Sequence, residues 1–129
     1  MNKSEILTGF NNHILEFFND VLLIFPNNSD IKVANTSLAT IKKMNPKLII
    51  TIWKKYISDP YKDEINNNNI DFFINRDYHN DLQHTDNATI ILQKIDTLRG
   101  PVKLMKHEDK QKTITYLQNL SKLCDLYFV

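Results

Sequence analysis

The sequence contains few cysteines and glycines, the residues that disulfide-bonded and nucleotide-binding domains require. Its single cysteine, Cys124, excludes an internal disulfide and a cysteine-based zinc site, and such sparing use suits a reducing compartment. Two glycines cannot form a phosphate-binding loop or a dinucleotide fingerprint. Because glycine is so scarce and there are only four prolines, the composition favours helices over hairpins.

The charged residues are balanced in number but uneven in position. The 129 residues are 42% hydrophobic and 24% charged, which is enough for one domain with its own core. With a net charge of +1, no global field draws the chain to nucleic acid or to an anionic membrane. No stretch is apolar for long enough to span a bilayer, and no secretory signal is expected. Lysines follow an acidic middle, formed by Asp59, Asp63, Glu64, Asp71, Asp77, Asp81 and Asp86.

The N-terminal third shows the clearest 3.6-residue repeat of apolar side chains, and this repeat predicts two helices. The first is expected over residues 4–25, with Ser4 as its N-cap and His13 at the edge of the apolar face. The second, capped by Ser29 or Asp30, is expected to end at residue 44.

Residues 45–58 form the stretch around which the rest of the chain is expected to be organised. Read as a helix, they carry an apolar arc of roughly 200°, twice the ~100° stripe of an ordinary surface helix. Pro46 suits the first helical position, so Asn45 is expected to be the N-cap. We expect several neighbours to cover this helix and to bury Trp53.

The C-terminal half predicts further helices. A short one is expected over residues 60–66, and the cluster over 70–74 is expected to be helical because no second strand is available to pair with it. A helix over 86–99 is expected to end at Gly100-Pro101. The last helix is expected over 108–127. The pattern as a whole predicts an all-α fold, a compact bundle of about five to seven helices in a single domain.

No residue pattern carries recognisable catalytic chemistry. Cys124 lies on the apolar face of the last helix, where burial is expected to raise its pKa and keep the thiol inert. No nucleophile elbow is present. We therefore predict that the protein is not an enzyme and needs no cofactor.

One acidic stretch contains alternating ligand types, namely Asp77, His79, Asp81, His84 and Asp86. Imidazole and carboxylate groups together can bind zinc or another divalent ion. However, histidines five residues apart do not share a helical face, and the glycine and glutamate of a calcium loop are missing. A solvated acidic loop explains the pattern, and no metal is expected.

Basic side chains cluster where the last helix is expected to begin. Such a cluster can meet phosphates without reading sequence, which makes nucleic acid a candidate partner. It lacks the interleaved aromatic side chains that stack on bases, and a solvated face is the alternative interpretation. The candidate nucleic-acid contacts are Arg99, Lys103, Lys106, Lys110 and Lys112.

The last helix has more apolar residues than one inward face needs. An inward stripe is expected to include Ile114, Leu117, Cys124 and Phe128. Further apolar residues lie beside this stripe, and part of this extension is expected at the surface. It is the candidate interface for a protein partner or for a homodimer, and its residues are Leu120, Leu123, Leu126 and Tyr127.

Several stretches spread over nearly the whole chain carry a family resemblance. In chain order they are FNNHILEFFNDVLLIFPNNSDI, MNPKLIITIWKKYI, DFFINRDY, LRGPVKLM and TYLQNLSKLCDLY. Together they resemble a family of small proteins encoded by nucleocytoplasmic large DNA viruses. The resemblance implies an intracellular viral protein of the infected host cell, in the cytoplasm or viral factory, made late or packaged in the virion.

Three hypotheses for the function follow. The first is a non-enzymatic viral protein that acts by protein–protein contact, as a virion component or assembly factor. The second is a nucleic-acid-binding accessory protein that uses the basic cluster. The third, ranked last, is a metal-dependent activity at His79 and His84.

Overall fold

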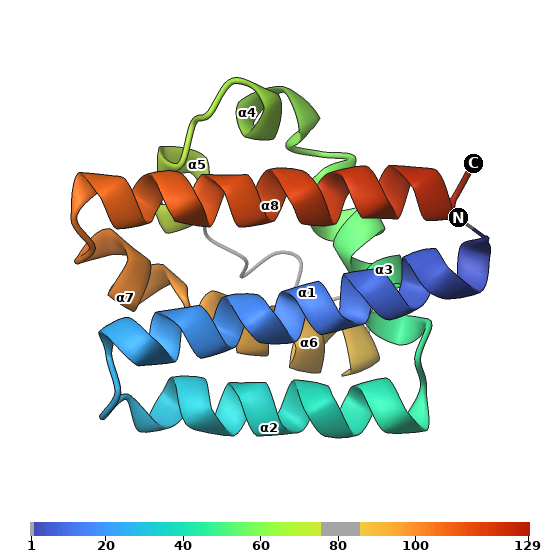
Figure 1. The fold of residues 1–129 in the computed structure, drawn as a ribbon, viewed down its shortest axis with the longest axis horizontal. Helices are drawn as coiled ribbons and strands as arrows, with labels where there is room; N and C mark the ends of the chain where they lie inside the picture. The colour runs from blue at the N-terminus through green and yellow to red at the C-terminus, as the bar shows by residue number, and fades with distance from the viewer. Residues whose placement is uncertain (1, 76–85) are drawn as a thin grey trace.

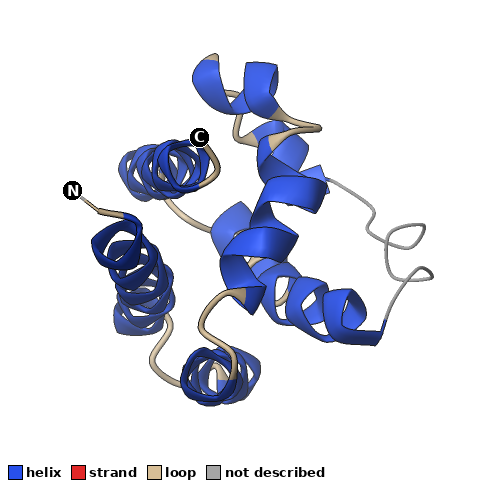
Figure 2. Ribbon diagram, turned by 90° about the vertical axis from the view of Figure 1, so that its right-hand side faces the viewer, coloured by secondary structure: helices blue, strands red, loops and turns tan. Residues whose placement is uncertain are grey.

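The computed structural model describes residues 2–75 and 86–129, and every regular element within these two ranges is helical. Three long helices, α1 (Lys3–Ile24), α2 (Ser29–Met44) and α8 (His107–Tyr127), lie side by side (Figure 1). Behind them lie α3 (Leu48–Trp53), its π-helical continuation η1 (Lys54–Ser58), and α6 (Asp86–Asp96), as Figure 2 shows from the side. The prediction of an all-α bundle is confirmed.

The remaining short helices lie at the margins of these two layers. Helix α4 (Lys62–Asn66) lies beyond α8, α5 (Asp71–Asn75) lies behind α8, and α7 (Arg99–Lys103), which contacts α5, lies at one end of the long helices (Figure 1). Helix α1 runs antiparallel to both α2 and α8, so the two chain ends meet at the opposite end of the molecule. The short helices predicted over 60–66 and 70–74 are both present.

The core fills the space between the two layers. Its fully buried aromatic side chains come from α1, α3 and α5. Trp53 is 1% exposed, as predicted, and its ring meets the edge of Phe10 at a centroid distance of 6.1 Å. Such aromatic pairs add to the stability that area burial alone provides.

Two helix starts differ from the prediction because asparagine side chains cap them. The Asn2 carboxamide oxygen accepts a hydrogen bond of 2.9 Å from the Glu5 backbone N–H, so Ser4 is not the N-cap of α1. The Asn28 carboxamide oxygen accepts one of 3.0 Å from Ile31 N–H, so neither Ser29 nor Asp30 caps α2. Asparagine is as good an N-cap as serine, and each cap lies upstream of the predicted one.

The organising helix is shorter and less regular than predicted. Asn45 closes α2, where its backbone N–H donates to Ile41 O at 2.8 Å, and α3 starts only at Leu48. After Trp53 the helix widens to the π form, in which Asp59 N–H donates to Lys54 O at 3.0 Å. The predicted burial on several sides is confirmed, because α1, α2, α6 and α8 all contact α3.

Gly100-Pro101 does not end the sixth helix, contrary to the prediction. Helix α6 already ends at Asp96, and the Gly-Pro pair lies in the first turn of α7. Proline is tolerated there because the first helical N–H groups have no partner inside the helix. Val102 N–H then donates to Leu98 O at 2.9 Å and closes the turn.

Candidate partner-binding surface

The last turn of α8 carries the apolar side chains that this helix leaves exposed. Leu126 is 54% exposed and Phe128, placed in the inward stripe by the sequence pattern, is 39% exposed. Leu123 and Tyr127 are half-buried and pack against the core. The prediction that Leu120 belongs to this extension is wrong, because its side chain is fully buried.

Leu120 is buried because other elements cover α8 along most of its length. It packs against α1 on one side and against α3, η1 and α4 on others, so a wide arc of its surface is inside the molecule. Thr113 and Ser121 are buried together with the apolar side chains of the stripe. The predicted interface is therefore reduced to the end of the helix.

A groove of about 310 Å³ lies beside this last turn, where α1 begins and α3 is about to begin. Leu7 and Tyr127 supply its apolar side chains, and Ser4 adds a hydroxyl group. Lys3 and Lys47 line it as well, and both are exposed. Within residues 2–75 and 86–129 neither lysine has an acidic partner. The groove therefore combines the apolar side chains of Leu7 and Tyr127 with two positive charges that are not neutralised in these ranges.

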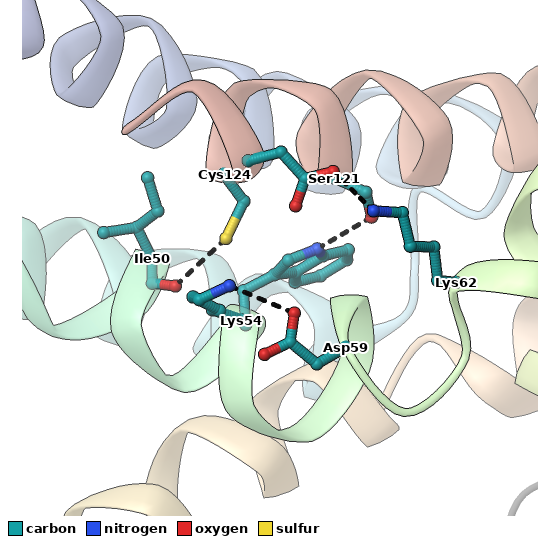
Figure 3. Close-up of polar contacts among 8 residues, drawn as sticks. Ile50, Lys54, Asp59, Lys62, Ser121 and Cys124 are labelled. Carbon is teal, nitrogen blue, oxygen red and sulfur yellow. Dashed lines mark hydrogen bonds and ion pairs between the residues drawn. The ribbon is translucent and has the colours of Figure 1, made fainter. Parts of the chain in front are cut away.

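An aromatic pair joins this groove to the π-helix. The rings of Tyr127 and Phe128 are nearly perpendicular, with centroids 5.0 Å apart. The Lys54 ammonium lies 5.5 Å from the Phe128 ring centroid and pairs with Asp59 at 3.1 Å (Figure 3). The hydrogen bond from Lys54 to Asp59 raises the pKa of the lysine, so its positive charge is retained beside the ring. We call Lys3, Leu7, Lys47, Leu126, Tyr127 and Phe128 together the terminal surface.

Beneath the terminal surface, two buried polar contacts hold α8 on α3. The indole N–H of Trp53 donates to the Ser121 hydroxyl at 3.2 Å, and the Cys124 thiol donates to Ile50 O at 3.6 Å (Figure 3). Burial raises the pKa of the Cys124 thiol to about 12. The thiol is therefore neutral near pH 7 and is a poor nucleophile.

Helix α4 anchors the outer side of this region. Lys62, the first residue of α4, pairs with Asp125 of α8 at 3.7 Å (Figure 3). Gln118 of the same helix donates to Ile65 O at 3.0 Å and to the Asn68 side chain at 2.8 Å. The C-terminal half of α8 is thus tied to two neighbouring elements, and its last turn projects from a fixed base.

A second groove, of about 490 Å³, runs between α1 and α8 and was not predicted from the sequence. In it, Tyr116 donates a hydrogen bond to the Asp20 carboxylate and stacks on Phe17, with ring centroids 4.9 Å apart. Burial and the bond to Asp20 raise the pKa of Tyr116. The half-buried His13, at the helix edge as predicted, lies 3.5 Å from Glu16. The remaining lining is polar, and Lys112 is its one charged residue; the other three are Gln111, Thr115 and Asn119.

The structure does not bring the five predicted basic residues onto one face. Lys112 lines the groove between α1 and α8, whereas Lys110, two residues earlier, lies about 200° around the helix. Arg99 forms an ion pair with Asp96 at 3.4 Å. Only Lys103 and Lys106, both exposed, and the half-buried Lys110 remain as a possible cluster near the start of α8.

Most of the predicted metal-binding alternation lies outside the described residues. This holds for Asp77, His79, Asp81 and His84, and the side chain of Asp86 is not described either. Elsewhere in the chain, over the described ranges, no group of three or more histidine, cysteine, aspartate or glutamate side chains is arranged to hold a metal ion.

Comparison of the chain with protein-family models, with curated proteins and with solved structures finds no match. None of the helices in the described ranges is both long enough and apolar enough to cross a membrane. The terminal surface, with its exposed apolar side chains and unpaired lysines, is the feature from which a function can be argued.

Proposed function

We propose that this protein is non-enzymatic and acts by protein–protein contact through the terminal surface. In the viral context that the sequence resemblance implies, it is a virion component or an assembly factor. The observation that carries the proposal is an exposed apolar last turn of α8 directly beside an apolar groove rimmed by lysines.

The composition of the surface supports a contact role. Aromatic and aliphatic side chains supply binding energy at protein interfaces, and a charged rim supplies orientation and specificity. Here Tyr127 and Phe128 supply aromatic area, while Lys3 and Lys47 supply charge. The residues come from three parts of the chain, so the surface exists only in the folded protein.

The rigidity of the surface also supports binding. The aromatic pair is anchored by Lys54, and α8 is anchored by its bonds to α3 and by the ion pair to Lys62. A preorganised surface loses less conformational entropy when a partner binds. By contrast, the one thiol of the chain is buried and neutral, which supports a role other than cysteine-based catalysis.

The test is a comparison of cross-linked partners for two matched variants of the full chain, in the cells that produce it. Leu126→Glu places a charge in the terminal surface, whereas Leu104→Glu places one on a leucine outside it that is more exposed, at 77% against 54%. Both changes are at the surface and should alter the free energy of unfolding by no more than about 0.5 kcal/mol.

We expect at least one protein, the chain itself included, to be recovered with wild type and with Leu104→Glu. Its recovery should fall at least about tenfold with Leu126→Glu, because a buried charge costs more than ~1.4 kcal/mol in an apolar contact. If the two variants and wild type recover the same proteins in equal amounts, the terminal surface is not the contact site and the proposal fails.

A further inference from the structure

The edge formed by α4 and α5 has the opposite charge to the terminal surface. Asp63, Glu64 and Asp71 have no ion-pair partner among the described residues, whereas nearby Asp59 and Lys62 are each already paired. The half-buried Phe72 lies on the same edge and stacks on Tyr61, with ring centroids 5.3 Å apart. We call Asp63, Glu64, Asp71 and Phe72 the acidic edge.

The two surfaces are complementary in both charge and chemistry. One is a groove with two lysines, and the other is an edge with one half-buried aromatic ring and three carboxylates; within residues 2–75 and 86–129 none of these five charged groups has an ion-pair partner. Opposed potentials orient partners and speed their encounter. Because the net charge of the whole chain is only +1, two copies do not repel one another overall.

The groove and the acidic edge lie on different sides of α8. The groove is on the side where α8 faces the start of α1, whereas α4 is tied to the side of α8 that carries Gln118 and Asp125. A copy that uses one surface therefore leaves its other surface available. Such a contact joins unlike patches, and contacts of this kind build rings or open filaments rather than closed pairs.

We infer that the groove of the terminal surface binds the acidic edge of a second copy of this chain, so that copies associate head to tail. The inference rests on the proposed contact function and names the partner. It differs from the homodimer expected from the sequence, in which the same face of the last helix would meet itself. It also gives an assembly role a physical basis, because each copy offers one groove and one acidic edge to its neighbours.

The association should be weak and sensitive to salt. A groove of about 310 Å³ is small, and exposed ion pairs contribute little to binding. We expect a dissociation constant of about 0.1–1 mM at low salt. Raising the ionic strength to about 0.5 M should weaken it severalfold, because salt screens exposed charges.

The test is analytical ultracentrifugation of the full chain with two charge-reversal variants. The first carries Lys3→Glu and Lys47→Glu in the groove, and the second carries Asp63→Lys and Asp71→Lys on the acidic edge. Each variant alone has two surfaces of the same sign and should sediment as a monomer at about 1 mM. An equimolar mixture restores opposite signs across the contact and should associate at least as strongly as wild type.

The matched control reverses two exposed lysines at the far end of the bundle, Lys103→Glu and Lys106→Glu. It changes the net charge by the same amount as the groove variant and should associate like wild type. Circular dichroism of every variant should show the helical content of wild type, because all six positions carry exposed side chains.

Three results would overturn the head-to-tail contact: a wild type that is monomeric at about 1 mM in low salt, reversal variants that associate unchanged, or a mixture that stays monomeric. The proposed function can survive each of these results. It fails separately, when Leu126→Glu leaves every cross-linked protein in place. A monomeric wild type that still loses a different partner on Leu126→Glu would keep the contact function and remove the second copy as the occupant.

Discussion

Trp53 joins the two layers of the fold through one large side chain and one hydrogen bond. Its ring is fully buried against Phe10, and its N–H reaches Ser121 on α8. Removing the ring leaves a cavity, whereas removing the hydroxyl leaves a buried donor without a partner. The two changes therefore separate packing from hydrogen bonding.

We expect Trp53→Ala to lower the free energy of unfolding by about 3–5 kcal/mol, as for other large core aromatics. Ser121→Ala should lower it by about 1–3 kcal/mol, which is the cost of the unpaired indole N–H. Urea unfolding followed by circular dichroism measures both. A loss below about 1 kcal/mol for Trp53→Ala would mean that the ring is not part of the core.

Cys124 makes the stability of the protein fall at alkaline pH. Burial raises the pKa of its thiol to about 12 in the folded protein, whereas an unfolded cysteine ionises near pH 8.5. Between these values the unfolded chain has lost the proton and the folded chain has kept it. The thiol therefore contributes its full stability below about pH 8.5, and that contribution is lost as the pH rises toward 12.

Replacing Cys124 by serine tests this contribution. Serine keeps a donor for Ile50 O and does not ionise in this pH range, so Cys124→Ser should flatten the fall in unfolding free energy between about pH 8.5 and 10. The fall that remains has the same sign, because the pKa of Tyr116 is also raised. Equal slopes for wild type and Cys124→Ser would show that the thiol is not protected by burial.

At the scale of the element, the start of α2 distinguishes two neighbouring capping residues. The sequence allowed Ser29 or Asp30, and the structure uses Asn28. Asn28→Ala should therefore cost about 0.5–2 kcal/mol of unfolding free energy, because Ile31 N–H loses its acceptor. Ser29→Ala, inside the first turn, should change it by less than about 0.5 kcal/mol. Thermal unfolding of the two variants measures the difference, and the reverse ranking would restore Ser29 as the cap.

The predictable parts of the fold are the long helices, and the reason is periodicity. Apolar residues such as Phe10, Ile14 and Phe17 recur at helical spacing and are all buried. That signal marks which face is inside and predicts the burial of Trp53 as well. It does not fix where a helix begins, because several capping residues lie close together and only the backbone decides among them.

Local sequence patterns do not predict the π-helix or the position of the Gly-Pro pair. Residues 54–58 keep the apolar spacing of an α-helix, so their wider turn leaves no trace in the pattern. Gly100-Pro101 fits a helix end and a helix start equally well by local chemistry, and the structure uses it in a start. In both cases the local pattern alone does not determine the outcome.

The candidate surface was only partly predictable for a related reason. Leu126 was correctly placed in the apolar excess of the last helix, but Leu120 lies in the core. The pattern of one helix does not tell how many neighbours it has, and α8 has several. The sequence pattern does not identify three further residues of this surface, Lys3, Leu7 and Lys47. Only the fold brings the start of α1 and the turn before α3 to the end of α8.

At the scale of the whole molecule, the distribution of basic residues limits how nucleic acid could be bound. Lys112 faces the groove beside Asp20, and Arg99 is paired with Asp96. Of the five basic residues predicted from the sequence, a duplex lying at the start of α8 can therefore meet three: Lys103, Lys106 and Lys110. Each phosphate contact on duplex DNA contributes about 0.9 to the slope of log affinity against log salt concentration.

We therefore expect duplex DNA to bind only at low salt, without sequence preference, and with a slope no steeper than about −3. Replacing Lys103, Lys106 and Lys110 by alanine should abolish the binding, while Lys112→Ala should leave the slope unchanged. Fluorescence anisotropy of a labelled duplex, titrated at several salt concentrations, measures both. A slope that flattens by about 0.9 on Lys112→Ala would show that the duplex reaches the groove between α1 and α8. Undetectable binding even at about 20 mM salt would remove nucleic acid as a partner and leave the protein contact as the remaining function.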